Sequence, residues 1–412
     1  MTKKTIFLDV AFWSLVTICV LNLNGVATLG FGFSQTTTPL IALLCFAVLY
    51  LLNFSPERHI GKPEFWFIIF ILVYLGIGTS SKFDFRTFTA HCGTLLLVIS
   101  VSVGTQEQIL RHGILKTFTR MAVISAVSGL LILTSPFLTP LYSKMSKVIA
   151  GFESGRWIGF FANPNSAGVA ATLGSTLLIS VIPLKRSINL RWKLVIIILV
   201  LFLALATFLT FSRTAGFIFL AAFSTLLLLN FRPSGRWLAA MVIFSLSLSF
   251  IFWFFTGGYR NFDLSREQLR RVKSVSVIVE KRDLGSRANS SNAGLDYMKK
   301  APIFGHGLGT FHRMPRKYYG GLGCHNTHLM VIGEGGIVTA FFYFLFILNL
   351  FLSIARIKPP LKWILLITCL IFFLFAATSH DFFTDRNLNV FLGFVMGVTT
   401  VGNLHPKFAD NH

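Results

Sequence analysis

Long runs of apolar residues alternate with short polar segments along almost the entire chain. Twelve of these runs are close to the roughly 20 residues that a helix needs to cross the hydrocarbon core of a bilayer. They lie near residues 5–24, 37–54, 64–80, 87–104, 117–135, 158–184, 194–211, 214–231, 237–256, 326–354, 363–383 and 387–403. Ser212 and Arg213 alone separate the seventh run from the eighth, and one helix made of both would be about twice as long as a bilayer requires. We therefore predict two helices joined by a tight turn.

The composition narrows the class of protein to which this pattern belongs. Hydrophobic residues make up 54% of the 412 residues, charged residues make up 13%, and the mean hydropathy is +0.71. Soluble globular domains carry about 25% charged residues, so a soluble enzyme and a disordered chain are excluded. The five cysteines show no CxxC spacing, which excludes a disulfide scaffold and favours small buried side chains. The predicted fold is an all-α integral membrane protein with about twelve transmembrane helices.

The Lys and Arg residues give this predicted bundle an orientation. With the N-terminus in the cytoplasm, the inner segments would hold seventeen Lys and Arg residues and the short outer loops seven. Cytoplasmic loops carry the excess of basic residues in membrane proteins, so both termini are predicted to be cytoplasmic. The net charge of +22 on a largely apolar chain favours membrane anchoring over nucleic-acid binding, and no nucleic acid is expected as a partner.

One predicted outer connection, residues 257–324, is far longer than the others. It holds thirteen Lys and Arg residues against five Asp and Glu, a local net charge of +8. Loops of this length are usually functional or disordered. Leu264 to Val279 combine helically spaced apolar residues with basic ones, which indicates an amphipathic helix on the membrane surface or over a cavity; a solvated helix without a ligand is the alternative. The chain thus divides into transmembrane helices 1–9 (1–256), a long, partly helical periplasmic loop (257–324) and helices 10–12 (325–412).

Five polar residues from separate stretches are predicted to share the outer face. They are Arg156, Arg213, Arg287, His325 and Asp381. Guanidinium groups bind phosphate oxygens bidentately and stay charged at any relevant pH, so three arginines at one face suit a diphosphate. Arg213 lies in a two-residue turn, where an arginine is costly to insert into the membrane, and this favours a functional role. Snorkelling to lipid headgroups is the alternative explanation for any one of these residues.

The segment around His325 holds further candidates. An imidazole at the membrane edge can take a proton from a hydroxyl near neutral pH, so His325 is the candidate base. Asn326 would cap the next helix or bind substrate, and His328, one turn further on, is a second polar residue that could line the site. Asn163 lies in an Asn-Pro-Asn sequence that interrupts the start of a span, as backbone beside a polar cavity does. Glu334 is expected to face the interior of the bundle.

The sequence contains no motif that requires a metal or a cofactor. Acidic residues do not cluster with metal-ligand spacing on the predicted outer side, and no phosphate-binding glycine loop follows a strand. We therefore expect neither a metal nor a cofactor such as ATP or NAD. The glycines of GHGLGTF (Gly305, Gly307 and Gly309) are a weak signal that indicates a turn before the last group of helices.

Four motifs taken together resemble one family. In order they are R-x-x-G-x-x-x-N-P-N, S-R-x-x, S-R followed by PIFGHGLGTF, and HN-x-x-L-x-x-x-x-E-x-G, over about residues 156–340. This order is similar to that of the O-antigen ligase and Wzy-type O-antigen polymerase superfamily. The resemblance implies a multi-pass glycosyltransferase of the GT-C type in the bacterial inner membrane, with an active site that faces the periplasm and needs no metal.

The resemblance also implies substrates and residue roles. The donor would be an undecaprenyl-diphosphate-linked glycan. The acceptor would be a lipid A-core sugar in a ligase, or a second lipid-linked glycan in a polymerase. Essential roles would fall on Arg213, Arg287 and His325, with further roles for Arg156 and Asp381.

Two interpretations from different classes stay open at this point. In a glycan transferase, basic residues late in the long loop would form a vestibule for anionic lipid and core phosphates: Lys299, Lys300, Arg313, Arg316 and Lys317. A transporter or flippase usually has repeated halves with helices interrupted at mid-membrane, and no such repeat is visible. Among transferases, the presence of one large outer loop instead of two favours a ligase over a polymerase.

Overall fold

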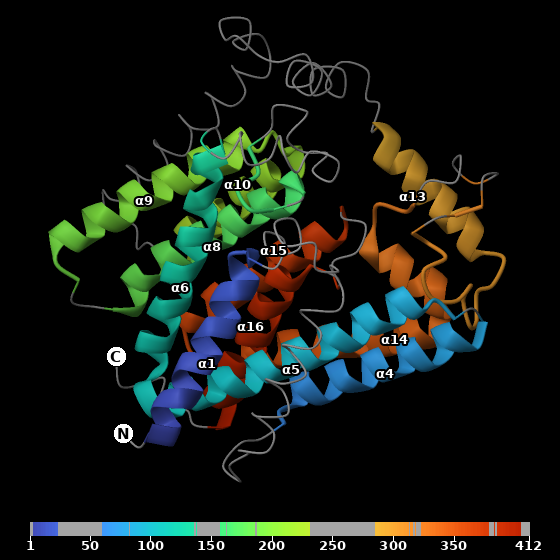
Figure 1. Ribbon diagram of the computed structural model, residues 1–412, viewed down its shortest axis with the longest axis horizontal. Coiled ribbons are helices and arrows are strands. Elements are labelled where there is room, and N and C mark those ends of the chain that lie inside the picture. Colours follow the sequence, from blue (N-terminus) through green and yellow to red (C-terminus); the bar gives the residue numbers. More distant parts are fainter. Residues whose placement is uncertain are drawn as a thin grey trace, which may run out of the picture.

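The computed structural model of this chain is built from α-helices (Figure 1). It describes residues 3–23, 60–81, 83–135, 137, 157–161, 163–185, 188–230, 285–312, 314–315, 318, 323–378, 383 and 385–404. The helices are α1 (Lys3–Val20), α4 (Lys62–Ser81), α5 (Phe85–His112), α6 (Ile114–Leu130), the 3-10 helix η1 (Leu131–Thr134), α8 (Pro164–Leu184), α9 (Leu190–Leu209), α10 (Arg213–Asn230), α13 (Gly285–Met298), α14 (Thr327–Ala355), α15 (Leu361–Ala376) and α16 (Arg386–Leu404). These ranges contain no strand, so the predicted all-α class is confirmed for them.

Seven of the described helices are long and apolar enough to cross a membrane. They are α4, α5, α6 continued by η1, α8, α9, α14 and α16, whereas α1 and α15 contain shorter apolar helices. Ten of the twelve predicted apolar runs coincide with a described helix, and the runs near 37–54 and 237–256 lie outside the described residues. The total of twelve spans therefore stays a prediction. The amphipathic helix expected over Leu264 to Val279 also falls outside the described ranges.

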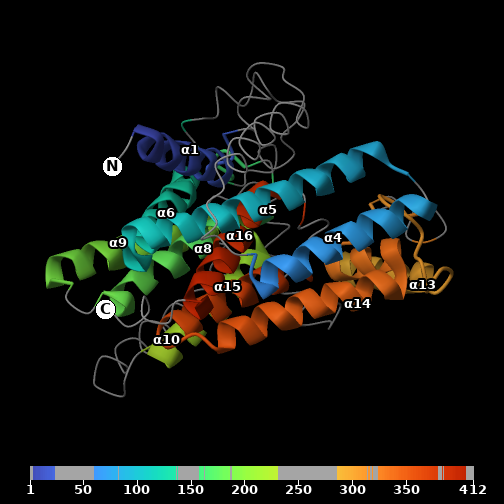
Figure 2. The same cartoon turned by 90° about the horizontal axis from the view of Figure 1, so that it is seen from below.

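Close helix pairs form the interior of the bundle. α6 packs on α8, α5 packs on α16, and α4 runs along α14 (Figure 2). Gly393 and Gly397 of α16, four residues apart, face the backbone of α5. A Cβ atom at these glycines would come within 2.5 Å of the Val98 carbonyl oxygen and 2.4 Å of the Ser102 carbonyl oxygen. Small residues at this spacing let two helices approach closely in a membrane, where van der Waals packing drives their association.

A buried carboxylate joins three of these helices. The Glu64 side chain, at the start of α4, is fully buried. Its Oε1 atom accepts hydrogen bonds from the Ser102 hydroxyl of α5 (2.6 Å) and the Thr400 hydroxyl of α16 (2.8 Å). The Gln106 amide contributes a longer hydrogen bond of 3.4 Å. A buried polar group without partners is costly, so this set of donors ties α4, α5 and α16 together.

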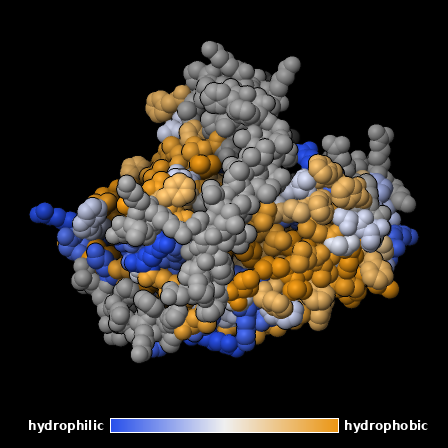
Figure 3. Space-filling view, turned by 60° about the horizontal axis from the view of Figure 1, so that its bottom comes forward, coloured by the Kyte–Doolittle hydropathy of each residue, from blue (hydrophilic) through white to orange (hydrophobic). Residues whose placement is uncertain are grey.

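The outward faces of several helices are apolar. α14 exposes large hydrophobic residues three or four positions apart: Ile337, Phe341, Phe344, Leu348 and Leu352. α9 does the same with Leu194, Ile198, Leu201 and Leu205. Figure 3 shows a broad hydrophobic surface on one face of the molecule. Exposed apolar surface of this extent suits contact with lipid chains and agrees with the multi-pass membrane protein predicted from the sequence.

Several chain segments meet where α1 ends. The Val20 carbonyl accepts a hydrogen bond from the Asn387 amide at the start of α16 (3.2 Å). The Asn22 amide donates to the carbonyl of Phe160 (2.8 Å), which lies in the short segment 157–161 before α8. We call this part of the bundle, defined by Val20, Asn22, Phe160 and Asn387, the distal end.

Candidate functional site

The tight turn between α9 and α10 belongs to the candidate site. α9 ends at Leu209 and α10 begins at Arg213, so the two helices predicted on either side of this turn are confirmed. The Arg213 side chain is exposed in the first turn of α10. The hydroxyl of the preceding residue, Ser212, donates a hydrogen bond to the Oδ1 atom of Asn165 in the first turn of α8 (2.8 Å). This bond fixes the start of α10 against the start of α8.

Two further predicted motifs surround the same turn. Asn163 caps α8, because its side-chain oxygen accepts the backbone N–H of Asn165 (2.8 Å). The backbone N–H of Trp157 donates to the Leu209 carbonyl at the end of α9 (3.2 Å). The Ser-Arg motif, the Asn-Pro-Asn motif and the segment that follows Arg156 are therefore neighbours, although they are far apart in sequence. Arg156 itself lies outside the described residues.

A second group of site residues is held together by the Ser290 hydroxyl. Arg287 lies in the first turn of α13, and Ser290 follows it by one turn of the same helix. The buried Ser290 hydroxyl donates to the Gly323 carbonyl (3.1 Å) and accepts the backbone N–H of His325 (3.1 Å). The helix that carries Arg287 thus contacts the segment that carries His325.

Asn326 and His328 both make contacts inside the protein. Asn326 caps α14, with its Oδ1 atom accepting the backbone N–H of Leu329 (3.1 Å). The His328 ring lies between the Phe373 carbonyl (3.1 Å from Nε2) and the Tyr343 hydroxyl (2.7 Å from Nδ1). A carbonyl can only accept, so Nε2 carries the hydrogen, and Nδ1 of the neutral ring accepts from Tyr343. His328 therefore links α14 to α15, and substrate contacts of Asn326 and His328 stay predictions.

α15 lies between the two groups of site residues. α10 packs against α15, and Phe373, which binds His328, is in the last turn of α15. The chain then passes to α16, whose Asn387 is bonded to Val20 at the distal end. Arg213 and His325 therefore lie at the same end of the bundle. The side of the membrane that this end faces stays a prediction, and Asp381 lies outside the described residues.

The GHGLGTF sequence folds over a break in α14. The backbone N–H groups of His306 and Gly307 donate to the carbonyls of Gly333 and Glu334 (2.9 and 3.0 Å). Gly305 has φ +71°, and a Cβ atom there would lie 2.3 Å from the Glu334 carbonyl oxygen. The turn predicted from the glycines is confirmed.

The continuous helix predicted over 326–354 is wrong at one residue, Gly336. This residue has φ +68° and ψ −170°, so the two parts of α14 do not share regular helical geometry. A Cβ atom at Gly336 would lie 2.0 Å from the Ile303 carbonyl oxygen, so only glycine fits this contact. The break therefore exists where the segment 302–307 packs onto α14, a contact that helical periodicity does not encode.

Comparison with known families shows what this part of the chain is similar to. Residues 198–344 match the family model described as O-antigen ligase. Over this segment the chain is similar to the O-antigen ligase family. The resemblance inferred from the sequence motifs is thereby confirmed, and the matched residues include Arg213, Arg287 and His325 of the O-antigen ligase segment. Arg156, Asn163 and Asp381 fall outside the match. No curated protein matches the chain.

One buried carboxylate in the O-antigen ligase segment makes contacts that could not be predicted from the sequence. Glu334 is fully buried beside the break in α14. Its Oε2 atom accepts the Tyr74 hydroxyl of α4 (2.6 Å), and its Oε1 atom accepts the backbone N–H of Phe311 (3.0 Å). The His312 Nδ1 atom is 3.6 Å from the same Oε1. Glu334 therefore holds the end of the GHGLGTF segment between α4 and α14. The sequence signal was its place in the HN-x-x-L-x-x-x-x-E-x-G motif, two residues before a glycine.

Replacement of Glu334 by alanine is expected to destabilise the protein and reduce its activity. The Tyr74 hydroxyl and the Phe311 N–H would lose their acceptor inside a dry interior, at roughly 1–3 kcal/mol for each unpaired group. Glu334→Gln keeps a side-chain oxygen and should cost less. Thermal unfolding of the detergent-solubilised protein measures the effect. Asp296→Ala, an exposed carboxylate of α13 paired only with Lys299 among the described residues, is the control and should unfold like the wild type. Equal stability of Glu334→Ala and wild type would contradict this role.

A small aromatic core supports the loop of the O-antigen ligase segment. The Tyr297 ring of α13 stacks on the His306 ring with centroids 3.8 Å apart, and on Phe311 at 5.3 Å. The His306 Nε2 atom lies 2.8 Å from the Tyr297 carbonyl oxygen. Burial raises the pKa of the Tyr297 phenol above its usual value, so this hydroxyl stays protonated at neutral pH. Aromatic packing, in addition to hydrogen bonds, therefore holds the loop in place.

Cys324, directly before His325, is a packing residue. It is buried against α13, and burial raises the pKa of its thiol to about 11. The neutral thiol is a poor nucleophile. Cys19 and Cys369 are also buried, as predicted for small apolar side chains. Among the described residues, no three His, Cys, Asp or Glu side chains are grouped so that they could hold a metal ion.

Proposed function

We propose that the protein is an O-antigen ligase-type glycosyltransferase. It transfers a glycan from an undecaprenyl-diphosphate carrier to a lipid A-core sugar at the periplasmic face of the bacterial inner membrane. The observation that carries the proposal is the family match over residues 198–344, because it contains Arg213, Arg287 and His325. The fold adds support, since the turn before Arg213 and the segment of His325 lie at one end of the bundle.

The arginines act on the donor. A glycan leaves its lipid carrier when the bond between the anomeric carbon and the diphosphate oxygen breaks, and negative charge then grows on that oxygen. Arg213 and Arg287, with Arg156 as a third candidate, stabilise this charge with bidentate hydrogen bonds. Asn163, Asn326, His328 and Asp381 complete the proposed substrate-binding set. The energy for transfer is already stored in the diphosphate linkage, so the scheme uses neither ATP nor a metal.

His325 acts on the acceptor. Its imidazole removes a proton from the attacking sugar hydroxyl, which then displaces the diphosphate from the anomeric carbon. Ser290 supports this role, because its hydroxyl fixes the backbone N–H of His325. A single displacement inverts the anomeric configuration, so the linkage formed should be inverted relative to the donor.

A Wzy-type polymerase is the alternative within the same family. It would join the glycan to a second lipid-linked repeat unit with the same chemistry. The sequence predicts one large outer loop, at 257–324, and this favours the ligase. A transporter or flippase is the alternative outside the family. Transporters usually have repeated halves with interrupted helices, and the sequence shows no such repeat, which favours the enzyme.

Deletion of the gene separates these functions. A ligase deletion removes all long glycan chains from lipopolysaccharide and leaves lipid-linked polymer in the membrane. A polymerase deletion leaves lipopolysaccharide capped with a single repeat unit. Transfer by the purified protein in detergent with excess EDTA then tests the metal-free scheme. An absolute need for a divalent metal, or retention of the anomeric configuration, would overturn the mechanism.

The proposed orientation predicts which residues are accessible from the periplasm. A cysteine at Lys299, exposed directly after α13, should react with an impermeant maleimide added to intact spheroplasts. A cysteine at Lys185, exposed at the end of α8, should react only after the membrane is opened. The protein without an introduced cysteine is the control, and its labelling gives the background reaction of the native thiols. Labelling of Lys185→Cys but not of Lys299→Cys in closed cells would invert the orientation.

A further inference from the structure

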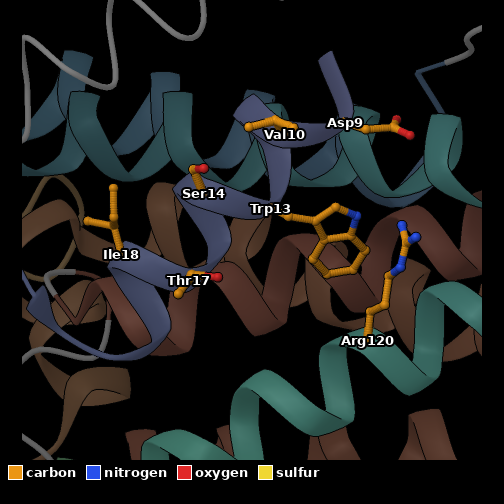
Figure 4. A pocket seen from close by; sticks show the side chains of 7 residues that line it. All are labelled: Asp9, Val10, Trp13, Ser14, Thr17, Ile18 and Arg120. Atoms are coloured by element: carbon orange, nitrogen blue, oxygen red, sulfur yellow. The ribbon is translucent and has the colours of Figure 1, made fainter. Parts of the chain in front are cut away.

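A groove lies between α1 and α6 and runs along α1 from Asp9 to Ile18, opposite Arg120 in the second turn of α6. It has a volume of about 540 Å³ and is lined by Asp9, Val10, Trp13, Ser14, Thr17, Ile18 and Arg120 (Figure 4). The six residues from α1 recur at spacings of one and three, so they form one face of that helix. Arg120 of α6 supplies the positive charge.

Arg120 makes contacts that leave its charge uncompensated. Its guanidinium carbon lies 5.7 Å from the centre of the Trp13 ring, and its Nη1 atom donates to the Gln108 side-chain oxygen (3.4 Å). Figure 4 shows the two side chains next to each other. Both partners are neutral. Within the part of the chain that the structure describes, no carboxylate lies within 4.0 Å of the guanidinium.

The one acidic residue of the groove is already bound by other groups. The Asp9 carboxylate accepts the Gln108 amide (2.6 Å) and contacts the His112 ring (2.7 Å) and the Arg111 guanidinium (3.4 Å). Asp9 lines the groove, but its carboxylate is already engaged by Gln108, Arg111 and His112 of α5. An ammonium group in the groove would find no free carboxylate in these contacts, whereas a phosphate would find Arg120.

The face of α6 that borders the groove changes from charged to apolar along its length. Lys116, one turn before Arg120 on α6, is exposed and adds a second positive charge. Side chains of a helix point back toward its N-terminus, so both cations are directed toward the membrane interface. In the other direction Val123 and Val127 follow on the same face of α6 and are 50% and 42% exposed. Val10 and Ile18 line the α1 side.

We propose that this groove binds an anionic phospholipid of the leaflet at the N-terminal ends of α1 and α6. The headgroup phosphate is held by Arg120 and Lys116. An acyl chain lies along the exposed valines of α6 and along Val10, Trp13 and Ile18 of α1. Basic pockets between transmembrane helices bind the headgroups of anionic lipids in this way. The site is separate from the proposed glycan-transfer site and does not depend on it.

Lipid retention by the purified, delipidated full chain tests the proposal. Phosphatidylglycerol and phosphatidylcholine with identical acyl chains are offered together, and the bound lipid is measured by native mass spectrometry. Phosphatidylglycerol should be retained preferentially, and Arg120→Gln should weaken its binding about tenfold or more, the effect of losing a charge-assisted hydrogen bond. Lys116→Gln, at an exposed position that does not affect folding, should weaken it less. Arg356→Gln, the same change at an exposed arginine after α14, is the matched control and should bind like the wild type.

Three outcomes would overturn the proposal. Equal retention of the two lipids would remove the charge selectivity, and unchanged binding in both Arg120→Gln and Lys116→Gln would place the lipid elsewhere. Displacement of phosphatidylglycerol by millimolar inorganic phosphate would indicate a simple anion site without a lipid chain. A separate measurement locates the acyl chain. Brominated phosphatidylglycerol should quench the fluorescence of Trp13, which is the part of the protein's fluorescence that is absent from Trp13→Phe. Absence of that quenching would contradict the placement of the chain along α1.

Discussion

Replacement of Arg213 or Arg287 by alanine should reduce glycan transfer by at least about a hundredfold while the protein still inserts and folds. Each arginine is proposed to stabilise the charge that develops on the departing diphosphate, and loss of one such group typically costs two to three orders of magnitude in turnover. Arg213 is exposed in the first turn of α10, so a shorter side chain there should not disturb packing. Transfer from a lipid-linked donor by purified protein is the measurement.

Lysine variants distinguish diphosphate recognition from simple anchoring by charge, and replacement of an arginine outside the proposed site is the control. Arg213→Lys and Arg287→Lys keep the charge but lose the bidentate geometry, so activity should return only in part. Arg191→Ala removes an exposed arginine from the first turn of α9. Arg213 follows the opposite end of α9, so this variant should leave transfer unchanged. Full activity in the lysine variants would support charge anchoring alone. Full activity in the alanine variants would remove these residues from the site.

Replacement of His325 by alanine should lower turnover by roughly a hundred- to ten-thousand-fold, the usual contribution of a general base. The hydrogen bond that Ser290 makes to this residue uses the backbone N–H, so the variant should keep the local structure. Donor binding should persist, because the arginines that hold the diphosphate are unchanged. Single-turnover transfer at saturating donor measures the loss separately from binding.

The structural histidine of the same helix provides the comparison for this experiment. His328 is bonded through both ring nitrogens to Tyr343 and Phe373, so His328→Ala should lower the thermal stability. His325→Ala should leave that stability close to the wild-type value. Near-wild-type turnover in His325→Ala would refute its role as the base.

Local sequence signals predicted the features that depend on short stretches of chain. The combined length of the apolar runs at 194–211 and 214–231 required a break, and the structure has it at residues 210–212, directly before Arg213. The possibility that Asn326 caps a helix followed from its position before an apolar run, and it does so. Such features need only helical periodicity, bilayer thickness and capping preferences.

Features that depend on distant partners could not be predicted in the same way. The carboxylate of Glu334 is bonded to Tyr74, 260 residues away in sequence, and no local pattern specifies that contact. The break at Gly336 exists because residues 302–307 pack there, and the bonds of His328 depend on where α15 lies. A single sequence indicates that such a residue is polar or small, but only the assembled bundle shows which group it meets.

The contacts of α16 with the early helices α4 and α5 have a consequence for biosynthesis. Glu64 receives one of its short hydrogen bonds from Thr400, 336 residues later, and the face of α5 that holds Val98 and Ser102 is covered by the glycines of α16. These contacts can form only after the ribosome has completed almost the entire chain. Until then a carboxylate inside the membrane lacks one of its donors, and the early helices lack their packing surface. A chain that ends before α16 should therefore be recognised and degraded by membrane proteases, even though every proposed transfer residue would already have been synthesised.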